Sequence, residues 1–180
     1  MILAIVLLVI VAIVAIWFVS VSNSFKRTLT LVEQAKADIE IYMVKRYDVI
    51  QNSLKTVKEF VKHEDEVFNK LIEIRKGMDV EELSKQASLQ EKAGAGLVAL
   101  AEAYPELKSQ DLFVQLQKQL SDENEHYAAA KRAYNSNVSV FNQQVVVFPN
   151  SIIAGMCGYE KLPFFADENA ESKKEADVEF

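Results

Sequence analysis

One uninterrupted helical pattern runs from Phe113 to Phe148 and reads FVQLQKQLSDENEHYAAAKRAYNSNVSVFNQQVVVF. Apolar side chains recur in it at steps of three and four residues, the spacing that places them on one face of an α-helix. They are Phe113, Leu116, Leu120, Tyr127, Ala130, Tyr134, Val138, Phe141, Val145 and Phe148. The pattern predicts an amphipathic helix of about forty residues, or roughly 60 Å, that packs against other helices along this face.

Three earlier segments show the same spacing of apolar residues. They carry Leu29, Val32, Ala35, Ile39, Tyr42 and Met43, then Ile50, Leu54, Val57, Val61, Phe68 and Ile72, then Leu83, Ala87, Leu97, Leu100, Ala101 and Tyr104. Only 5 Gly and 3 Pro occur in 180 residues, which argues against a turn-rich β fold. Short links between long amphipathic helices make neighbours antiparallel. The sequence therefore predicts an all-α fold with an up-and-down antiparallel helical bundle of three to four helices.

Capping and helix-breaking residues predict where these helices begin and end. Asn23 or Ser24 is expected to cap the first soluble helix, and Asp79 a later one, because their side chains accept hydrogen bonds from free backbone N–H groups. Pro105 is expected at a turn or in the first turn of a helix, and Pro149 after the last long helix.

The segment Ile2–Val21 reads ILAIVLLVIVAIVAIWFVSV and contains no charged residue. About twenty helical residues cross the roughly 30 Å hydrocarbon core of a bilayer. Trp17 and Phe18 lie near its end, where interfacial aromatic rings are favourable. A signal peptide would need a basic segment first, and none is present, so residues 1–22 are expected to form an uncleaved transmembrane anchor. Cleavage near Ser20 and Ser22 is the alternative.

Charge bears on location and partners. Lys26 and Arg27 follow the apolar segment, and the positive-inside rule predicts a cytoplasmic bundle in a single-pass cell-membrane protein. An extracytoplasmic bundle is the alternative. The net charge of −6 argues against nucleic-acid binding, which uses basic surfaces. The single Cys excludes an internal disulfide framework and a Cys-based zinc site.

The bundle is expected over residues 23–148, and a segment of different character follows at 149–165. The sequence FPNSIIAGMCGYEKLPFF is apolar and aromatic and is broken by Pro and Gly. It predicts a loop that either folds back on the bundle or docks on a partner or a membrane surface. The candidate interaction or fold-back residues are Phe148, Pro149, Asn150, Gly155, Gly158, Tyr159, Phe164 and Phe165. Residues 166–180 are predicted to be an acidic disordered tail.

Charged residues also interrupt the apolar helix faces. A buried charge is costly unless it is paired, so we expect a structural polar layer in which an Arg meets a Glu and fixes the register of the helices. The candidates are Arg46, Glu64, Arg75 and Glu123. The alternative is that these side chains extend to the bundle edge and keep their charges in water.

One motif is compatible with metal chemistry. Glu123 and His126 form a Glu-x-x-His pair on one helix face. Carboxylate di-metal bundles use two such motifs and two further Glu residues, and the only other His, His63, lacks the matching Glu. Cys157 has no sequence context that indicates an activated nucleophile. We expect no catalytic residue, metal or other cofactor. A metal-dependent enzyme or metal-binding bundle on the Glu123/His126 face is the alternative.

Three segments, Lys45–Glu64, Leu97–Asn124 and Ala133–Phe165, together resemble the LemA family of bacterial membrane proteins. The motifs that carry the resemblance are EAYP at 102–105, YN at 134–135, FN at 141–142, FPN at 148–150, AG at 154–155 and GY at 158–159. One departure is Gln51, where relatives often carry Pro. The resemblance implies a four-helix up-and-down bundle behind one transmembrane helix, without an agreed biochemical activity. A magnetosome-membrane member and a recurring association with membrane peptidases imply roles in membrane organisation or as adaptors.

These observations together predict a non-catalytic membrane-anchored scaffold or adaptor. The expected partners are the lipid bilayer and an unidentified membrane or envelope protein, with no nucleic acid. The exposed helix faces also allow a homo-oligomer. A transmembrane helical sensor is a second alternative, and it would require oligomerisation through those faces.

Overall fold

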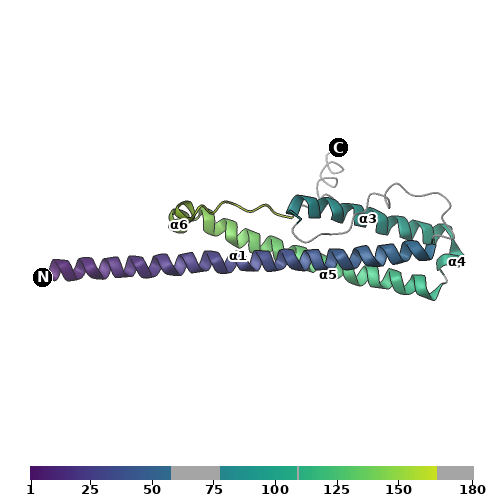
Figure 1. The fold of residues 1–180 in the computed structure, drawn as a ribbon, viewed down its shortest axis with the longest axis horizontal. Coiled ribbons are helices and arrows are strands. Elements are labelled where there is room, and N and C mark those ends of the chain that lie inside the picture. The colour runs from purple at the N-terminus through teal and green to yellow at the C-terminus, as the bar shows by residue number, and fades with distance from the viewer. Residues whose placement is uncertain (58–77, 109, 166–180) are drawn as a thin grey trace, which may run out of the picture. The chain divides into compact units, whose positions relative to one another are not determined.

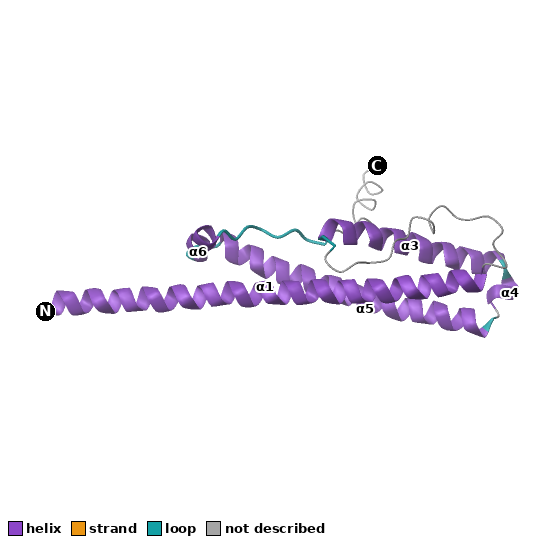
Figure 2. Cartoon of the chain, in the orientation of Figure 1, coloured by secondary structure: helices purple, strands orange, loops and turns teal. Residues whose placement is uncertain are grey.

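A computed structural model describes residues 1–57, 78–108 and 110–165. This part of the chain forms helices and no strand (Figure 1, Figure 2). The helices are α1 (Ile2–Val57), α3 (Val80–Ala103), α4 (Pro105–Lys108), α5 (Asp111–Val146) and α6 (Asn150–Cys157). The predicted all-α class is therefore confirmed. Glu64 and Arg75 of the predicted polar layer, His63 and the predicted acidic tail lie outside the described residues.

Helix α1 is longer than the sequence pattern predicted. It passes through Asn23 and Ser24 without a break, so the predicted helix start at these residues is wrong. Within the helix, the Ser24 carbonyl accepts a hydrogen bond from the Thr28 hydroxyl at 3.1 Å. A capping residue acts only where the chain enters a helix, and no Gly or Pro interrupts Ile2–Val57. Because Gln51 is not a Pro, α1 also continues through it.

The N-terminal part of α1 is, among the described residues, the helical segment that is long and apolar enough to cross a membrane. None of its apolar 18-residue window is buried inside protein. Large side chains such as Leu3, Leu7 and Ile16 are exposed along it. Such a surface is favourable in the hydrocarbon core of a bilayer and unfavourable in water. Length, composition and exposure therefore agree with a segment that crosses a membrane, and its retention as an uncleaved anchor stays a prediction.

The chain divides into two compact units. The terminal unit comprises Met1–Ala35 and Ala133–Phe164, and the central unit comprises the described residues of Lys36–Arg132 together with Phe165. Helices α1 and α5 each contribute to both units.

The central unit has its own apolar core, formed by the second part of α1 with α3, α4 and the first part of α5. The buried cluster contains Ile50, Val57, Ala93, Leu97, Ala101, Leu107, Phe113 and Leu120. Gly94 of α3 lies against α5, since a Cβ atom on it would sit 3.4 Å from Cδ2 of Leu120. A contact at this distance is ordinary van der Waals packing.

Local signals set the ends of α3 as predicted. Asp79 caps the helix: its side chain accepts a hydrogen bond from the Glu82 N–H at 2.8 Å, and its own N–H donates to the Glu82 carboxylate at 3.3 Å. This reciprocal pair is a capping box. Pro105 begins the short helix α4, and α5 ends three residues before Pro149.

In the terminal unit, α5 runs antiparallel to α1 (Figure 1). The Asn137 amide donates to the Leu31 carbonyl at 3.1 Å, and the Gln144 amide donates to the hydroxyls of Ser24 and Thr28 at 3.3 Å each. Residues later in α5 therefore meet residues earlier in α1, as the up-and-down arrangement requires.

Candidate functional site

Arg46 occupies the interior of the central unit. Its place on α1 between the buried Met43 and Ile50 puts it on the inward face, and it is only 4% exposed. The guanidinium carbon lies 4.7 Å from the centre of the Tyr127 ring on α5. The Lys131 ammonium lies 5.9 Å from the centre of the same ring. Two cations therefore share one aromatic side chain, an arrangement that offsets part of the cost of burying charge.

Burial lowers the pKa of Arg46, while Tyr127 and the Glu91 carboxylate of α3 raise it. An arginine remains protonated in spite of such shifts, so the centre of this unit carries a fixed positive charge. The Nε atom of Arg46 has no hydrogen-bond partner within the described structure.

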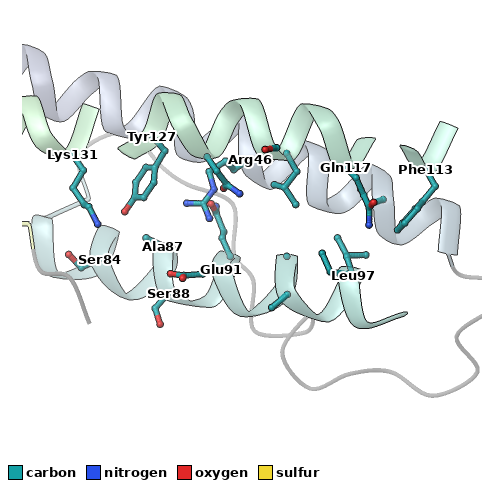
Figure 3. A pocket seen from close by; sticks show the side chains of 18 residues that line it. Arg46, Ser84, Ala87, Ser88, Glu91, Leu97, Phe113, Gln117, Tyr127 and Lys131 are labelled. Carbon is teal, nitrogen blue, oxygen red and sulfur yellow. The ribbon is translucent and has the colours of Figure 1, made fainter. Parts of the chain in front are cut away.

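A cavity of about 520 Å³ opens beside Arg46 between α1, α3 and α5. Figure 3 shows Tyr127 and Lys131 pointing from α5 toward α3, with Arg46 beside them. The lining mixes apolar side chains with polar ones such as Ser88 and Gln90. Gln90 is buried and donates a hydrogen bond from Nε2 to the Met43 carbonyl at 3.0 Å. The cavity is thus polar at its Arg46 end, where an anion or a carbonyl oxygen would find donors.

The predicted polar layer is placed only in part by the described residues. Arg46 is buried as a member of such a layer should be, and Glu123 on α5 is half-buried, with an Oε2 atom that has no hydrogen-bond partner within the described structure. The Arg–Glu pairing itself stays a prediction. Sequence reasoning missed Tyr127 and Glu91 as neighbours of Arg46. Tyr127 belongs to the predicted apolar face of its helix, and its ring lies against the Arg46 guanidinium.

The Glu123/His126 face, the alternative metal site, is not arranged as a set of metal ligands in the described residues. His126 is exposed, and its ring stacks on Tyr42 with ring centres 5.3 Å apart and an interplanar angle of 14°. In the ranges that the structure covers, no three His, Cys, Asp or Glu side chains are grouped as metal ligands would be. The Glu123/His126 alternative therefore gains no further ligand from its described neighbours.

The segment after α5 is the second candidate site, and it lies in the terminal unit up to Phe164. Where the sequence predicted a loop, Asn150–Cys157 forms the short helix α6. The helix ends at Gly158, whose φ of 70° is in the left-handed region that suits glycine, and the Tyr159 N–H then bonds to the Ala154 carbonyl at 2.9 Å. This turn sends the chain back along α5.

Asn142 holds the irregular segment that follows α6 against α5. Its Oδ1 atom accepts a hydrogen bond from the Leu162 N–H at 2.8 Å, and its Nδ2 atom donates to the Leu162 carbonyl at 2.9 Å. The Tyr134 hydroxyl donates to the Pro163 carbonyl at 3.1 Å, and burial raises the pKa of this phenol. Side chains of α5 thus satisfy a backbone that has no secondary-structure partner of its own.

Aromatic rings complete the packing of this segment. The Tyr159 ring stacks on Phe25 of α1 at 5.0 Å between centres and meets Phe141 of α5 edge-on at 5.9 Å. Phe25 and Phe141 also meet edge-on at 5.9 Å. In the central unit, Phe165 is buried and its ring lies 6.2 Å from that of Tyr127.

The candidate residues of this segment divide between inward and outward positions. Phe165 is buried, and Asn150 and Tyr159 are half-buried. The exposed candidates are Phe148, Pro149, Gly155, Gly158 and Phe164. Part of the segment therefore packs within the protein as the fold-back interpretation expected, and part presents apolar surface outward.

An all-α bundle with a candidate membrane helix at its N-terminus is the class of protein that these features define. The sequence model of the LemA family matches residues 35–180, and the chain belongs to this family. It is also similar to the magnetosome protein MamQ of Magnetospirillum gryphiswaldense, with 22% identity over 175 aligned residues. The match covers 79% of this chain and 64% of the relative, so the chain spans less than two thirds of that protein's length.

Proposed function

We propose that this chain is a single-pass, membrane-anchored scaffold or adaptor of LemA type without catalytic activity of its own. The observation that carries the proposal lies in the terminal unit, where one helix contains both the exposed apolar segment and the residues that pack on α5. No flexible joint separates the two, because no Gly or Pro interrupts α1. A membrane helix joined in this way holds a folded body at a set height above the bilayer.

Two further features support a scaffold. The buried charge at Arg46 lies over the Tyr127 ring and has the Glu91 carboxylate as an electrostatic neighbour, which fits a structural role. The similar protein MamQ is a magnetosome protein by name, and an organising role for the present chain fits that similarity. The partners would be the lipid bilayer and an unidentified membrane or envelope protein, and a second copy of the chain is an allowed partner.

Location follows the same reasoning. Lys26 and Arg27 are exposed on α1 directly after the apolar segment, and we propose on this basis that the bundle is cytoplasmic. The exposed Cys157, the only Cys in the chain, reports the side of the membrane. Labelling of intact cells by a membrane-impermeant maleimide, with Cys157→Ser as the blank, would place the bundle outside. Labelling only after lysis would support the cytoplasmic assignment.

The continuous helix α1 is also what a transmembrane sensor would need, because a rotation of the membrane helix would be passed to the residues that pack on α5. A sensor of this kind works through a change between oligomeric arrangements. Crosslinking in membranes that yields a ligand-dependent dimer would favour the sensor over the scaffold.

Metal analysis tests the non-catalytic part of the proposal. The untagged full chain, purified in detergent, is expected to carry no stoichiometric iron or manganese. Glu123→Gln and His126→Ala serve as matched variants. A stoichiometric metal that both variants lose would replace the scaffold with the metal-dependent alternative.

The membrane anchor has its own test. Release of the wild-type chain from membranes by alkaline carbonate would refute the anchor.

A further inference from the structure

Five large apolar side chains are exposed at the end of α5 and along α6, and we call them the corner patch: Val146, Val147, Phe148, Ile152 and Met156. Phe148 is 77% exposed and Met156 is 71% exposed, and the other three are more than half exposed. Exposed apolar surface of this density is unfavourable in water and marks a contact with another apolar phase.

The corner patch lies within a long stretch of chain that carries no charge and ends before Glu160 and Lys161. From Ala133 to Tyr159 the chain contains no Asp, Glu, Lys or Arg. Helix α1, on which Tyr159 packs through Phe25, is uncharged from Ile2 to Phe25. A protein-docking surface usually has a polar rim with charged groups, whereas a lipid-facing surface excludes them. The charge pattern therefore favours lipid as the occupant.

The register between α1 and α5 sets the height of the patch. Asn137 bonds to Leu31, and Gln144 bonds to Ser24 and Thr28. Moving along α5 from 137 to 144 thus moves back along α1 by a similar number of residues. At about 1.5 Å per residue, the end of α5 lies close to the level at which the uncharged apolar segment of α1 ends.

Packing and exposure place α6 at the same level. Tyr159, just after α6, stacks on Phe25 at 5.0 Å, only four residues beyond Val21. Val21 and Ser22 are half-buried, while Val19 and Ser20 before them are exposed. Figure 1 shows α6 at the point where α1 leaves its packed part and continues alone toward the N-terminus.

We propose that the corner patch inserts into the interfacial layer of the leaflet next to the end of the membrane segment, as a second attachment of the terminal unit to the bilayer. This inference rests on the proposed membrane anchor. Amphipathic segments of this kind bury their apolar face roughly 5–10 Å deep. Lys26 and Arg27, exposed about one turn beyond the apolar segment, are placed to meet lipid phosphates. Two attachments stop the terminal unit from rotating about the axis of its membrane helix.

Depth measurements on the reconstituted full chain test the proposal. A single Cys replaces Phe148 in a Cys157→Ser background, and a fluorophore on it is read in vesicles of phosphatidylcholine and phosphatidylglycerol. We expect several-fold weaker quenching by aqueous iodide than at Leu112→Cys in the same background, and strong quenching by brominated lipids. Leu112 is the matched control because it is also an exposed apolar residue of α5, 58% exposed, and lies in the central unit.

Three outcomes would overturn the inference. Equal iodide quenching at the two positions would show that the patch stays in water. Protection at position 148 without quenching by brominated lipids, and dependent on the protein-to-lipid ratio, would assign the patch to a second copy of the chain. Protection at position 148 without quenching by brominated lipids and without dependence on the protein-to-lipid ratio would assign the patch to contacts within the chain. In each case, retention of the chain in vesicles at alkaline pH would leave the membrane anchor intact, whereas its release would refute the anchor itself.

Discussion

The side chain of Asn142 is expected to hold the chain after α6 in place through its two hydrogen bonds to the backbone of Leu162, at 2.8 and 2.9 Å. Asn142→Ala removes both bonds and changes no charge. The apolar contacts of Tyr159 with Phe25 and Phe141 would remain. The substitution therefore isolates the polar part of the fold-back from its aromatic part.

The size of the effect follows from the two bonds. A hydrogen bond within a folded protein contributes about 1 kcal/mol net, so the loss of both weakens the local structure by about 2 kcal/mol. Because 1.4 kcal/mol is a factor of ten in an equilibrium constant, the population with this segment open should rise roughly 30-fold. Leu162 is half-buried, so water partly replaces the lost partners and this figure is an upper value.

Amide hydrogen exchange of the full chain in detergent measures this opening directly. The peptide that contains Leu162 should exchange up to about 30-fold faster in Asn142→Ala. Asn142→Asp should also accelerate exchange, because it keeps the acceptor for the Leu162 N–H but faces the Leu162 carbonyl with a second oxygen. Asn137→Ala is the control, since Asn137 makes one bond to Leu31 and none to this segment in the described structure. Unchanged exchange around Leu162 in Asn142→Ala would refute the reasoning.

Three further predictions concern stability, measured by urea unfolding of the full chain in detergent. Glu123→Gln should leave stability unchanged or slightly raised, because the Oε2 atom has no partner within the described structure; a clear loss would instead support the ion pair with Arg46. Gly94→Ala should add about 0.5–1 kcal/mol through helix propensity, since its Cβ would make an ordinary contact at 3.4 Å; destabilisation would show that the helices cannot accept a methyl group there. The raised pKa of Tyr134 predicts stability that is fully present below its unfolded value of 10.0 and is lost as the pH rises through the folded pKa; Tyr134→Phe should lack this loss.

Helix positions were largely predictable because they depend on local signals. The period of apolar residues predicted α5 and α3, and Asp79 formed the cap that its side chain can make. The prediction of a helix start at Asn23 or Ser24 failed for a local reason as well. A good capping residue does not interrupt a helix, and only Gly, Pro or a change of partner does so.

The candidate site was less predictable because its contacts join distant parts of the chain. Arg46 was a candidate for a buried polar layer, with extension to the bundle edge as the alternative, and burial is observed. Its neighbours Tyr127 and Glu91 come from α5 and α3. Periodicity ranks an aromatic residue as core and a Glu as surface, and it contains no information on which of them faces a given Arg.

Composition and spacing alone determined that this chain is all-α, that it begins with an apolar segment suited to a membrane, and that an unusual apolar segment follows the last long helix. These properties depend on neighbours in sequence. Tertiary structure alone decided which side of that last segment packs on the helices and which side is exposed. Asn142, Tyr134 and Phe25 hold one side of it. The register of α5 on α1 brings the exposed side to the level at which the apolar segment of α1 ends. The hydrogen bonds of Asn142 and Tyr134 join residues 20 and 29 positions apart. The α1–α5 bonds join residues more than a hundred positions apart, and no local pattern encodes either kind of contact.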